Sequence, residues 1–140
     1  MQIEIDPMSA VPIYQQIRDR VVEAVAGGRL APGEQLSSVR QLALDFGINV
    51  ATVTRAYDVL RSEGIIRTNH KSGSVIARGP ESAPADPAFV ADWSTRLATI
   101  LAEAIVQGLG DTAIAQNTAA ILEDFSARRS HQHPSKDSTS

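Results

Sequence analysis

The chain has 140 residues, 43% of them hydrophobic, and a formal net charge of −3. This length allows one or two small domains, and the absence of cysteine excludes disulfides, thiolate zinc ligands and a cysteine nucleophile. No run approaches the ~20 apolar residues of a membrane span, and the first residues lack the basic and apolar regions of a signal sequence. We therefore expect a cytoplasmic protein.

The charge is distributed unevenly along the chain. Residues 1–80 contain 9 Lys and Arg against 8 Asp and Glu, whereas residues 81–140 contain 4 against 8. Within residues 38–78 the balance is 6 basic to 3 acidic. This local excess of positive charge favours a polyanionic ligand such as DNA at that segment, although the whole chain is acidic.

The first predicted helix begins at Pro12, which has no N–H to leave unpaired in a first turn. The Gly27-Gly28 pair ends it. Between them one apolar stripe recurs at helical spacing, formed by Ile13, Ile17, Val21, Ala24 and Val25. A turn at residues 30–34 follows, and residues 34–36 are long enough for a very short strand.

Residues 38–60 contain two short helical patterns separated by a glycine break. The buried stripes are Val39, Leu42, Ala43 and Phe46 in the first pattern, and Val53, Ala56, Tyr57 and Leu60 in the second. Ser38 and Gln41 are spaced as a capping box, Gly47 suits the residue after the first helix, and Asn49 suits the N-cap of the second. The pattern is typical of a helix-turn-helix, whose second helix can enter a major groove.

A β-hairpin is predicted after this motif. Residues 65–68 and 74–77 have strand composition, and the connection between them carries His70 and Lys71. Three helices followed by a hairpin make a winged helix, in which the hairpin tip can reach the DNA backbone or the minor groove beside the second helix of the motif.

The C-terminal part is predicted to be a proline-rich linker at residues 79–87 and two helices at residues 88–127, the second capped by Asp111. Two helices of this size cannot cover both of their apolar stripes or enclose a ligand pocket of ~300 Å³. We therefore predict that they form the dimer interface between two copies of the chain. The predicted interface residues are Phe89, Trp93, Leu97, Ile100, Leu101, Ile114, Ile121, Leu122 and Phe125.

Residues 128–140 are polar, and we predict a disordered tail there. His131 and His133 do not make a metal site in such a tail, because two ligands on a loose segment hold no defined geometry. No metal or other cofactor is predicted. The fold class is thus mainly α with a small β-hairpin: a winged helix-turn-helix over residues 1–78, followed by a helical hairpin used for dimerisation.

Residues 11–78 resemble the GntR family of bacterial transcription regulators. The matching segments are Pro12 to Ile17, Gly28 to Leu30 with Pro32-Gly33, Leu36 with Ser38 to Ala43, Gly47 to Asn49, Thr52-Val53 with Arg55 to Tyr57, Leu60, Glu63-Gly64 and Gly73. The short C-terminal region is similar to that of the YtrA-type branch, which carries a two-helix dimerisation region in place of a large effector domain. The chain departs from the family pattern at Ser37 (usually Pro), at Val50 and Ala51 (often Arg or Pro, then Asn), and at Lys71 (usually Gly).

The resemblance implies seven DNA-contacting residues: Arg40, Asn49, Thr52, Thr54, Arg55, His70 and Lys71. Each has a plainer alternative. Arg40 lies against the dipole of a helix start, which favours a phosphate partner over water. Arg55 can approach guanine or a phosphate, or form an ion pair with Asp58. Asn49 can be a helix cap only, and the remaining four can simply be exposed.

We therefore predict a homodimeric, sequence-specific DNA-binding transcription regulator that recognises an inverted-repeat operator. A repressor is favoured over an activator because occluding a promoter requires only binding. The branch resemblance implies control of the protein's own operon and of a neighbouring transporter. The alternative is a winged helix used as a protein-interaction module. Catalysis is poorly supported, since no histidine lies beside a suitable Ser and Asp in sequence and no phosphate-binding glycine loop is present. The sequence specifies no small-molecule effector.

Overall fold

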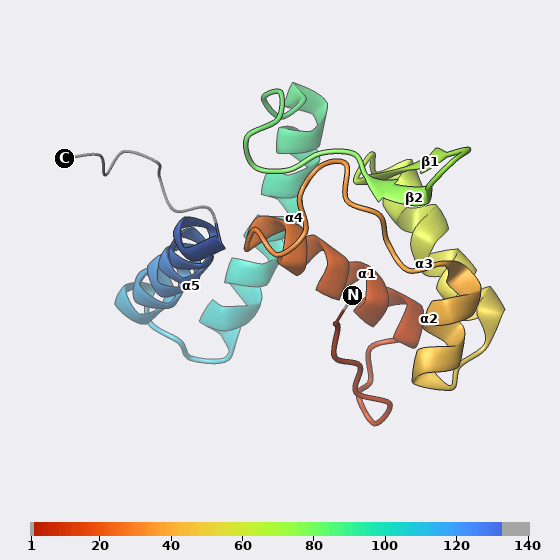
Figure 1. Cartoon of the computed structure of the whole chain (residues 1–140). Helices are drawn as coiled ribbons and strands as arrows, with labels where there is room; N and C mark the ends of the chain where they lie inside the picture. The colour runs from red at the N-terminus through yellow and green to blue at the C-terminus, as the bar shows by residue number, and fades with distance from the viewer. Residues whose placement is uncertain (1, 133–140) are drawn as a thin grey trace.

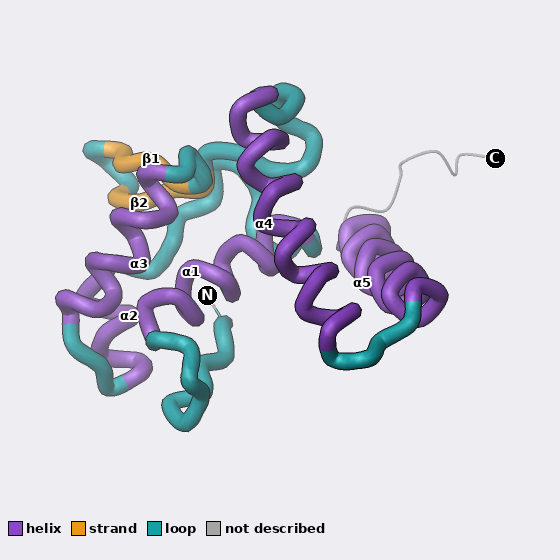
Figure 2. The backbone as a smooth tube through the Cα atoms, turned by 180° about the vertical axis from the view of Figure 1, so that it is seen from behind, coloured by secondary structure: helices purple, strands orange, loops and turns teal. Residues whose placement is uncertain are grey.

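The structure is a computed structural model, and it describes residues 2–132. Its helices and its antiparallel hairpin follow one another along the chain (Figures 1 and 2). The elements are α1 (Ile13–Ala26), α2 (Val39–Phe46), α3 (Val50–Ser62), β1 (Ile66–Asn69), β2 (Gly73–Ile76), α4 (Pro87–Val106) and α5 (Asp111–Gln132). The predicted fold class, a winged helix-turn-helix followed by a helical C-terminal region, is confirmed.

The ends of α2 and α3 are set by side-chain caps. Ser38 Oγ accepts a hydrogen bond from the Gln41 N–H at 3.1 Å, and Asn49 Oδ1 accepts from the Ala51 N–H at 2.8 Å. Gly47, with φ of 63°, takes the left-handed conformation that turns the chain between the two helices. The predicted capping box is only half formed, because the Gln41 side chain turns along the helix and donates to Asp45 Oδ1 at 2.7 Å.

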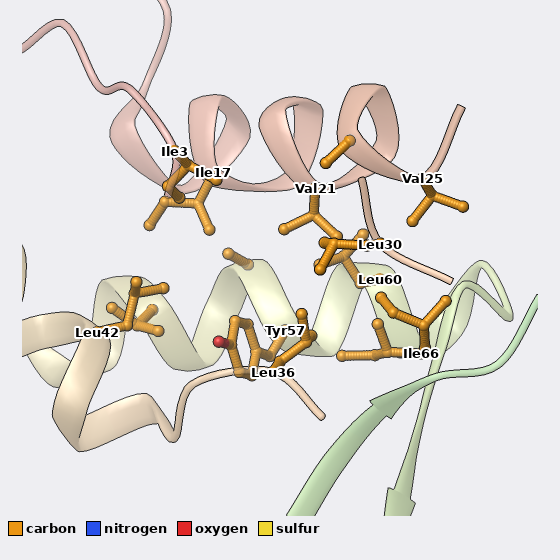
Figure 3. Close-up of a cluster of buried hydrophobic side chains, with 14 of the residues drawn as sticks. Ile3, Ile17, Val21, Val25, Leu30, Leu36, Leu42, Tyr57, Leu60 and Ile66 are labelled. Atoms are coloured by element: carbon orange, nitrogen blue, oxygen red, sulfur yellow. The ribbon is translucent and has the colours of Figure 1, made fainter. Parts of the chain in front are cut away.

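The hydrophobic core lies between α1 and α3 and extends to α2 and the hairpin (Figure 3). Val21 of α1 faces Leu60 of α3, and Ile17 lies beside Ile3 on the side of Leu42; Ile17, Val21 and Leu60 are fully buried. Tyr57 is also buried, and its hydroxyl donates to the Ser37 carbonyl at 2.7 Å. Burial raises the pKa of Tyr57 to about 12. The predicted buried stripes of α1 and α3 are the ones that form this core.

The hairpin pairs β1 with β2, and Ile66 lies opposite Ile76. The very short strand predicted at residues 34–36 is present as a bridge between Gln35 and Val75. The Leu36 N–H donates to the Ser74 carbonyl at 2.8 Å, and the Ile76 N–H donates to the Glu34 carbonyl at 2.9 Å. The segment before α2 therefore pairs with the second edge of β2 and joins the hairpin to the helices.

The helix ends of the C-terminal region correct three details of the prediction. Asp86 caps α4 by accepting the Ala88 N–H at 2.8 Å, so this helix begins at Pro87. The Ile114 N–H donates to the Gly110 carbonyl, so Asp111 is the first residue of α5 and not its cap. The predicted tail boundary at residue 128 is wrong, because α5 continues through Gln132.

The extra turn of α5 has two contacts that composition does not reveal. Arg128 forms an ion pair with Asp124 at 2.7 Å, one turn earlier in the helix. Arg129 Nη1 donates to the Ala26 carbonyl at 2.9 Å, where α1 ends and that carbonyl has no partner within its own helix. The remaining part of the predicted tail, residues 133–140 with His133, lies outside the described residues. His131 is exposed near the end of α5.

Candidate nucleic-acid interface

The exposed side of the N-terminal half of α3 carries most of the predicted base-reading residues. Asn49, Thr54 and Arg55 are exposed there, together with Val50 and Ala51, while Thr52 is half-buried. We call the five exposed residues the recognition face: Asn49, Val50, Ala51, Thr54 and Arg55. The buried Val53, Ala56 and Tyr57 on the opposite side of the helix hold this face outward.

Arg55 does not form the alternative ion pair with Asp58. Its guanidinium lies over the Tyr14 ring of α1, 3.8 Å from the ring centroid, while Asp58 pairs with Arg61 at 2.8 Å. A guanidinium stacked on an aromatic ring keeps its N–H groups in the plane free to donate. Tyr14 therefore orients the cation of the recognition face, and the sequence pattern had shown Tyr14 only as a residue of the first helix.

Arg40 is exposed near the start of α2. It borders a shallow surface hollow of about 410 Å³, which is also lined by Leu44, Ile48 and Val50. The hollow joins the first turn of α2 to the first turn of α3, so Arg40 and the recognition face lie on one continuous surface. This placement allows Arg40 to meet a phosphate beside the groove that α3 enters.

His70 and Lys71 are exposed in the turn between β1 and β2. The Asn69 side chain shapes this turn by accepting the Lys71 N–H at 2.9 Å. Arg61, which sequence reasoning did not single out, ties the hairpin to α3: it pairs with Asp58 and donates to Ser74 Oγ at 3.3 Å. The hairpin therefore has a defined position beside the C-terminal half of α3, and the exposed Arg67 on β1 adds a further cation.

The C-terminal arm, defined as α4 and α5, contains no buried residue. Among the predicted interface residues, Phe89, Trp93, Ile100, Ile121 and Leu122 are 45–65% exposed, and the other four are half-buried. Figures 1 and 2 show the arm on the opposite side of α1 from α2 and α3. A hollow of about 530 Å³ lies between the arm, the linker and the end of α1, and Val25, Pro32, Ser82 and Arg129 are among its lining residues.

Two further features of residues 2–132 bear on what this site can bind. No described helix is long and apolar enough to cross a membrane. Within the same residues, no group of three or more His, Cys, Asp or Glu side chains is placed to hold a metal ion. The exposed cations of the recognition face and the hairpin are Arg55, Arg67 and Lys71.

The fold and this surface define a winged helix-turn-helix protein with a helical C-terminal arm. Residues 13–76 match the model of the family described as bacterial regulatory proteins, gntR family. The chain is 36% identical to YtrA from Sulfolobus acidocaldarius, a GntR-family transcription factor; the similarity covers 74% of this chain and 97% of that one, with a TM-score of 0.58. The chain belongs to the GntR family.

Two other relatives show how far the similarity extends. The HTH-type transcriptional repressor YtrA of Bacillus subtilis is 41% identical over 80 residues, which are 57% of this chain and 62% of the repressor. The similarity thus spans less than two thirds of that relative. The crystal structure of a transcriptional antiterminator from Listeria monocytogenes is 28% identical, with a TM-score of 0.80 over 89% of this chain and 92% of that one. The arrangement of the arm is therefore shared with a solved structure, and not only the winged helix.

Proposed function

We propose that the protein is a homodimeric transcription regulator that binds an inverted-repeat DNA operator and acts as a repressor. The observation that carries the proposal is the combination of an outward recognition face, with Arg55 held over Tyr14, and a hairpin that places His70 and Lys71 beside the same helix. A short helix of this kind fits the major groove, and cations on a wing suit the adjacent backbone.

The C-terminal arm supports the dimer. Its exposed apolar side chains would be unusual on a monomer, and packing two arms together would cover them as in a helical bundle. A two-fold dimer carries two recognition helices, which suits two half-sites separated by about one helical turn, ~10 bp. The second half-site then binds in an effectively intramolecular step, which raises the affinity for the whole operator.

Repression follows from occupancy alone, since a bound dimer blocks access to a promoter. A relative of this chain is named a transcriptional repressor, which supports the same choice. Because the proposed ligand is DNA, we expect the protein to act in the cytoplasm, and binding DNA in this way requires neither catalysis nor a cofactor. The promoter of the protein's own operon is the first DNA to test.

The test is footprinting of that promoter, followed by affinity titration of the footprinted duplex and a scrambled duplex at several salt concentrations. We expect selective binding, with affinity that falls steeply as salt rises because basic side chains displace counterions. Lys71→Ala should weaken binding to both duplexes and make the salt slope shallower by about one unit. Arg96→Ala, which removes an exposed cation of the arm, is the matched control and should leave the slope unchanged. Equal affinity for both duplexes would support the alternative, a protein-interaction module.

A further inference from the structure

The two residues that open α3 are exposed, apolar and uncharged. Val50 is the first residue of the helix and is 46% exposed, and the exposed Ala51 follows it. The first turn contains no acidic residue, and the basic residue in the last turn is Arg61, at the opposite end. On α2, Leu44 is 77% exposed and borders the same hollow as Val50. An apolar surface therefore occupies the part of a recognition helix that meets base edges most directly.

The polar side chains at this end are Asn49, which is engaged as the N-cap of α3, and Thr52, which is half-buried. Asn49 Oδ1 accepts the Ala51 N–H at 2.8 Å, so the cap fixes the direction of this oxygen and leaves it one lone pair for another donor. Bidentate recognition of adenine by Asn needs both the oxygen and the nitrogen of the amide. Asn49 can therefore read adenine only from the orientation that the cap imposes, or by opening the cap of α3 at a cost of about 1 kcal/mol.

The chemistry of the major groove restricts what an apolar turn can recognise. Guanine, cytosine and adenine present hydrogen-bonding groups there, and thymine alone adds an apolar group, its C5-methyl. Val50 offers two methyl groups and no hydrogen-bonding atom. Ala51 has no long side chain, so it lets the helix approach the bases closely.

We propose that Val50 contacts the methyl group of one thymine in each operator half-site, and that this contact helps to select the base pair. The inference rests on the proposed function, since it requires α3 to lie in a major groove. Val50 would then be a specificity-determining residue that distinguishes base pairs by apolar contact, while the cations of the site contact the DNA backbone.

The experiment replaces each thymine of the footprinted half-site, one at a time, with deoxyuridine, which lacks only the methyl group. We expect one position per half-site at which this change lowers the affinity of the wild-type protein about fourfold, the effect of exposing one methyl-sized group at ~0.8 kcal/mol. The same change in the DNA should not lower the affinity of the Val50→Ala variant. At that position, 5-methylcytosine should bind better than cytosine to the wild-type protein. Val11→Ala is the matched control, because Val11 lies outside α2 and α3 and is similarly exposed, at 42%.

The outcomes separate this inference from the proposed function. Selective operator binding with no thymine sensitive to loss of its methyl group would overturn the role of Val50 and leave the regulator intact. If loss of the thymine methyl group weakens binding equally in the wild type and in Val50→Ala, another residue makes the methyl contact. That result would also overturn the role of Val50. Failure to distinguish the operator from a scrambled duplex would overturn both.

Discussion

The winged helix-turn-helix and the C-terminal arm place their apolar residues in opposite ways. All the buried hydrophobic residues of the described chain lie between Ile3 and Ile76, whereas α4 and α5 bury none and leave Trp93 and Leu122 exposed. The first region therefore has its own core, and its stability is a property of one chain. The second has the apolar surface of a core without the second layer, so its stability depends on what covers it.

The largest expected effect comes from placing a charge on the apolar side of the arm. Ile100→Glu should give a folded monomer with operator affinity reduced by about 10²–10⁴-fold, because an unpaired carboxylate is costly to bury and the intramolecular second binding step is lost. Light scattering and operator titration measure the two effects. Ile100 is 59% exposed within one chain, so the winged helix should remain folded.

Ala102→Glu is the matched control for this substitution. It adds the same charge to α4 on the side away from the apolar stripe, at an exposed position. We expect it to dimerise and bind like the wild type. A dimeric Ile100→Glu variant with full operator affinity would show that the arm is not the interface.

The next prediction compares the truncation of one leucine side chain to alanine in each region. Leu60 is fully buried, and Leu60→Ala should lower the free energy of unfolding by about 2–5 kcal/mol at any protein concentration. Leu122 is 65% exposed in the single chain, so Leu122→Ala should act only through the dimer. Its effect on the melting temperature should therefore disappear on dilution below the dimerisation constant. If both variants lost stability by an amount that did not depend on protein concentration, the arm would not depend on a second chain for its stability.

The same contrast explains how much of the fold could be predicted from the sequence. Val53, Ala56, Tyr57 and Leu60 are buried together because a helix with one packed side imposes a 3.6-residue period on its sequence. Composition gave the wrong end for α5, because the contact of Arg129 with the Ala26 carbonyl joins residues 103 positions apart. No local pattern contains such a contact.

The candidate site divides in a similar way. Exposure of Arg40, Thr54 and Lys71 follows from their places on helix faces and in a turn, and the structure agrees with it. The position of the Arg55 side chain over Tyr14 could not be predicted, because it depends on how α1 crosses α3. The cap at Asn49 was predicted and is present, and the hydrogen bond from the Ala51 N–H fixes the direction of Oδ1, which restricts how Asn49 can meet a base.

The third prediction concerns the pH dependence of the core. The pKa of Tyr57 is raised to about 12 by burial, against about 10 for an unfolded tyrosine. As pH rises above 10 the unfolded chain loses this proton first, so stability that is fully present below pH 10 falls until about pH 12, by about 2–3 kcal/mol. Urea unfolding at pH 9, 10, 11 and 12 measures this loss.

Tyr57→Phe should flatten that dependence, because the titrating group is gone. It should also cost about 1 kcal/mol at neutral pH, since the hydrogen bond to the Ser37 carbonyl is lost. Tyr14→Phe keeps the ring beneath Arg55 and provides the control. A Tyr57→Phe protein that loses stability between pH 10 and 12 as steeply as the control would place the titrating group elsewhere.

The smallest effect lies at the junction between the two regions. Arg129 of α5 donates to the carbonyl of Ala26 at the end of α1, and its backbone passes close to Gly28, with 3.4 Å between the Arg129 Cα and the position a Gly28 side chain would take. Arg129→Ala should lower the free energy of unfolding by about 1 kcal/mol, because a carbonyl at a helix end loses a charged donor. Arg128→Ala removes only an exposed pair with Asp124 within α5, so it should cost less.

If the arm is to hold two recognition faces at a fixed separation, the contact made by Arg129 must restrict the angle between α5 and α1. Titration of operators with one or two base pairs inserted between the half-sites tests this: Arg129→Ala should tolerate the insertions better than Arg128→Ala, and equal tolerance would make this contact a matter of stability alone.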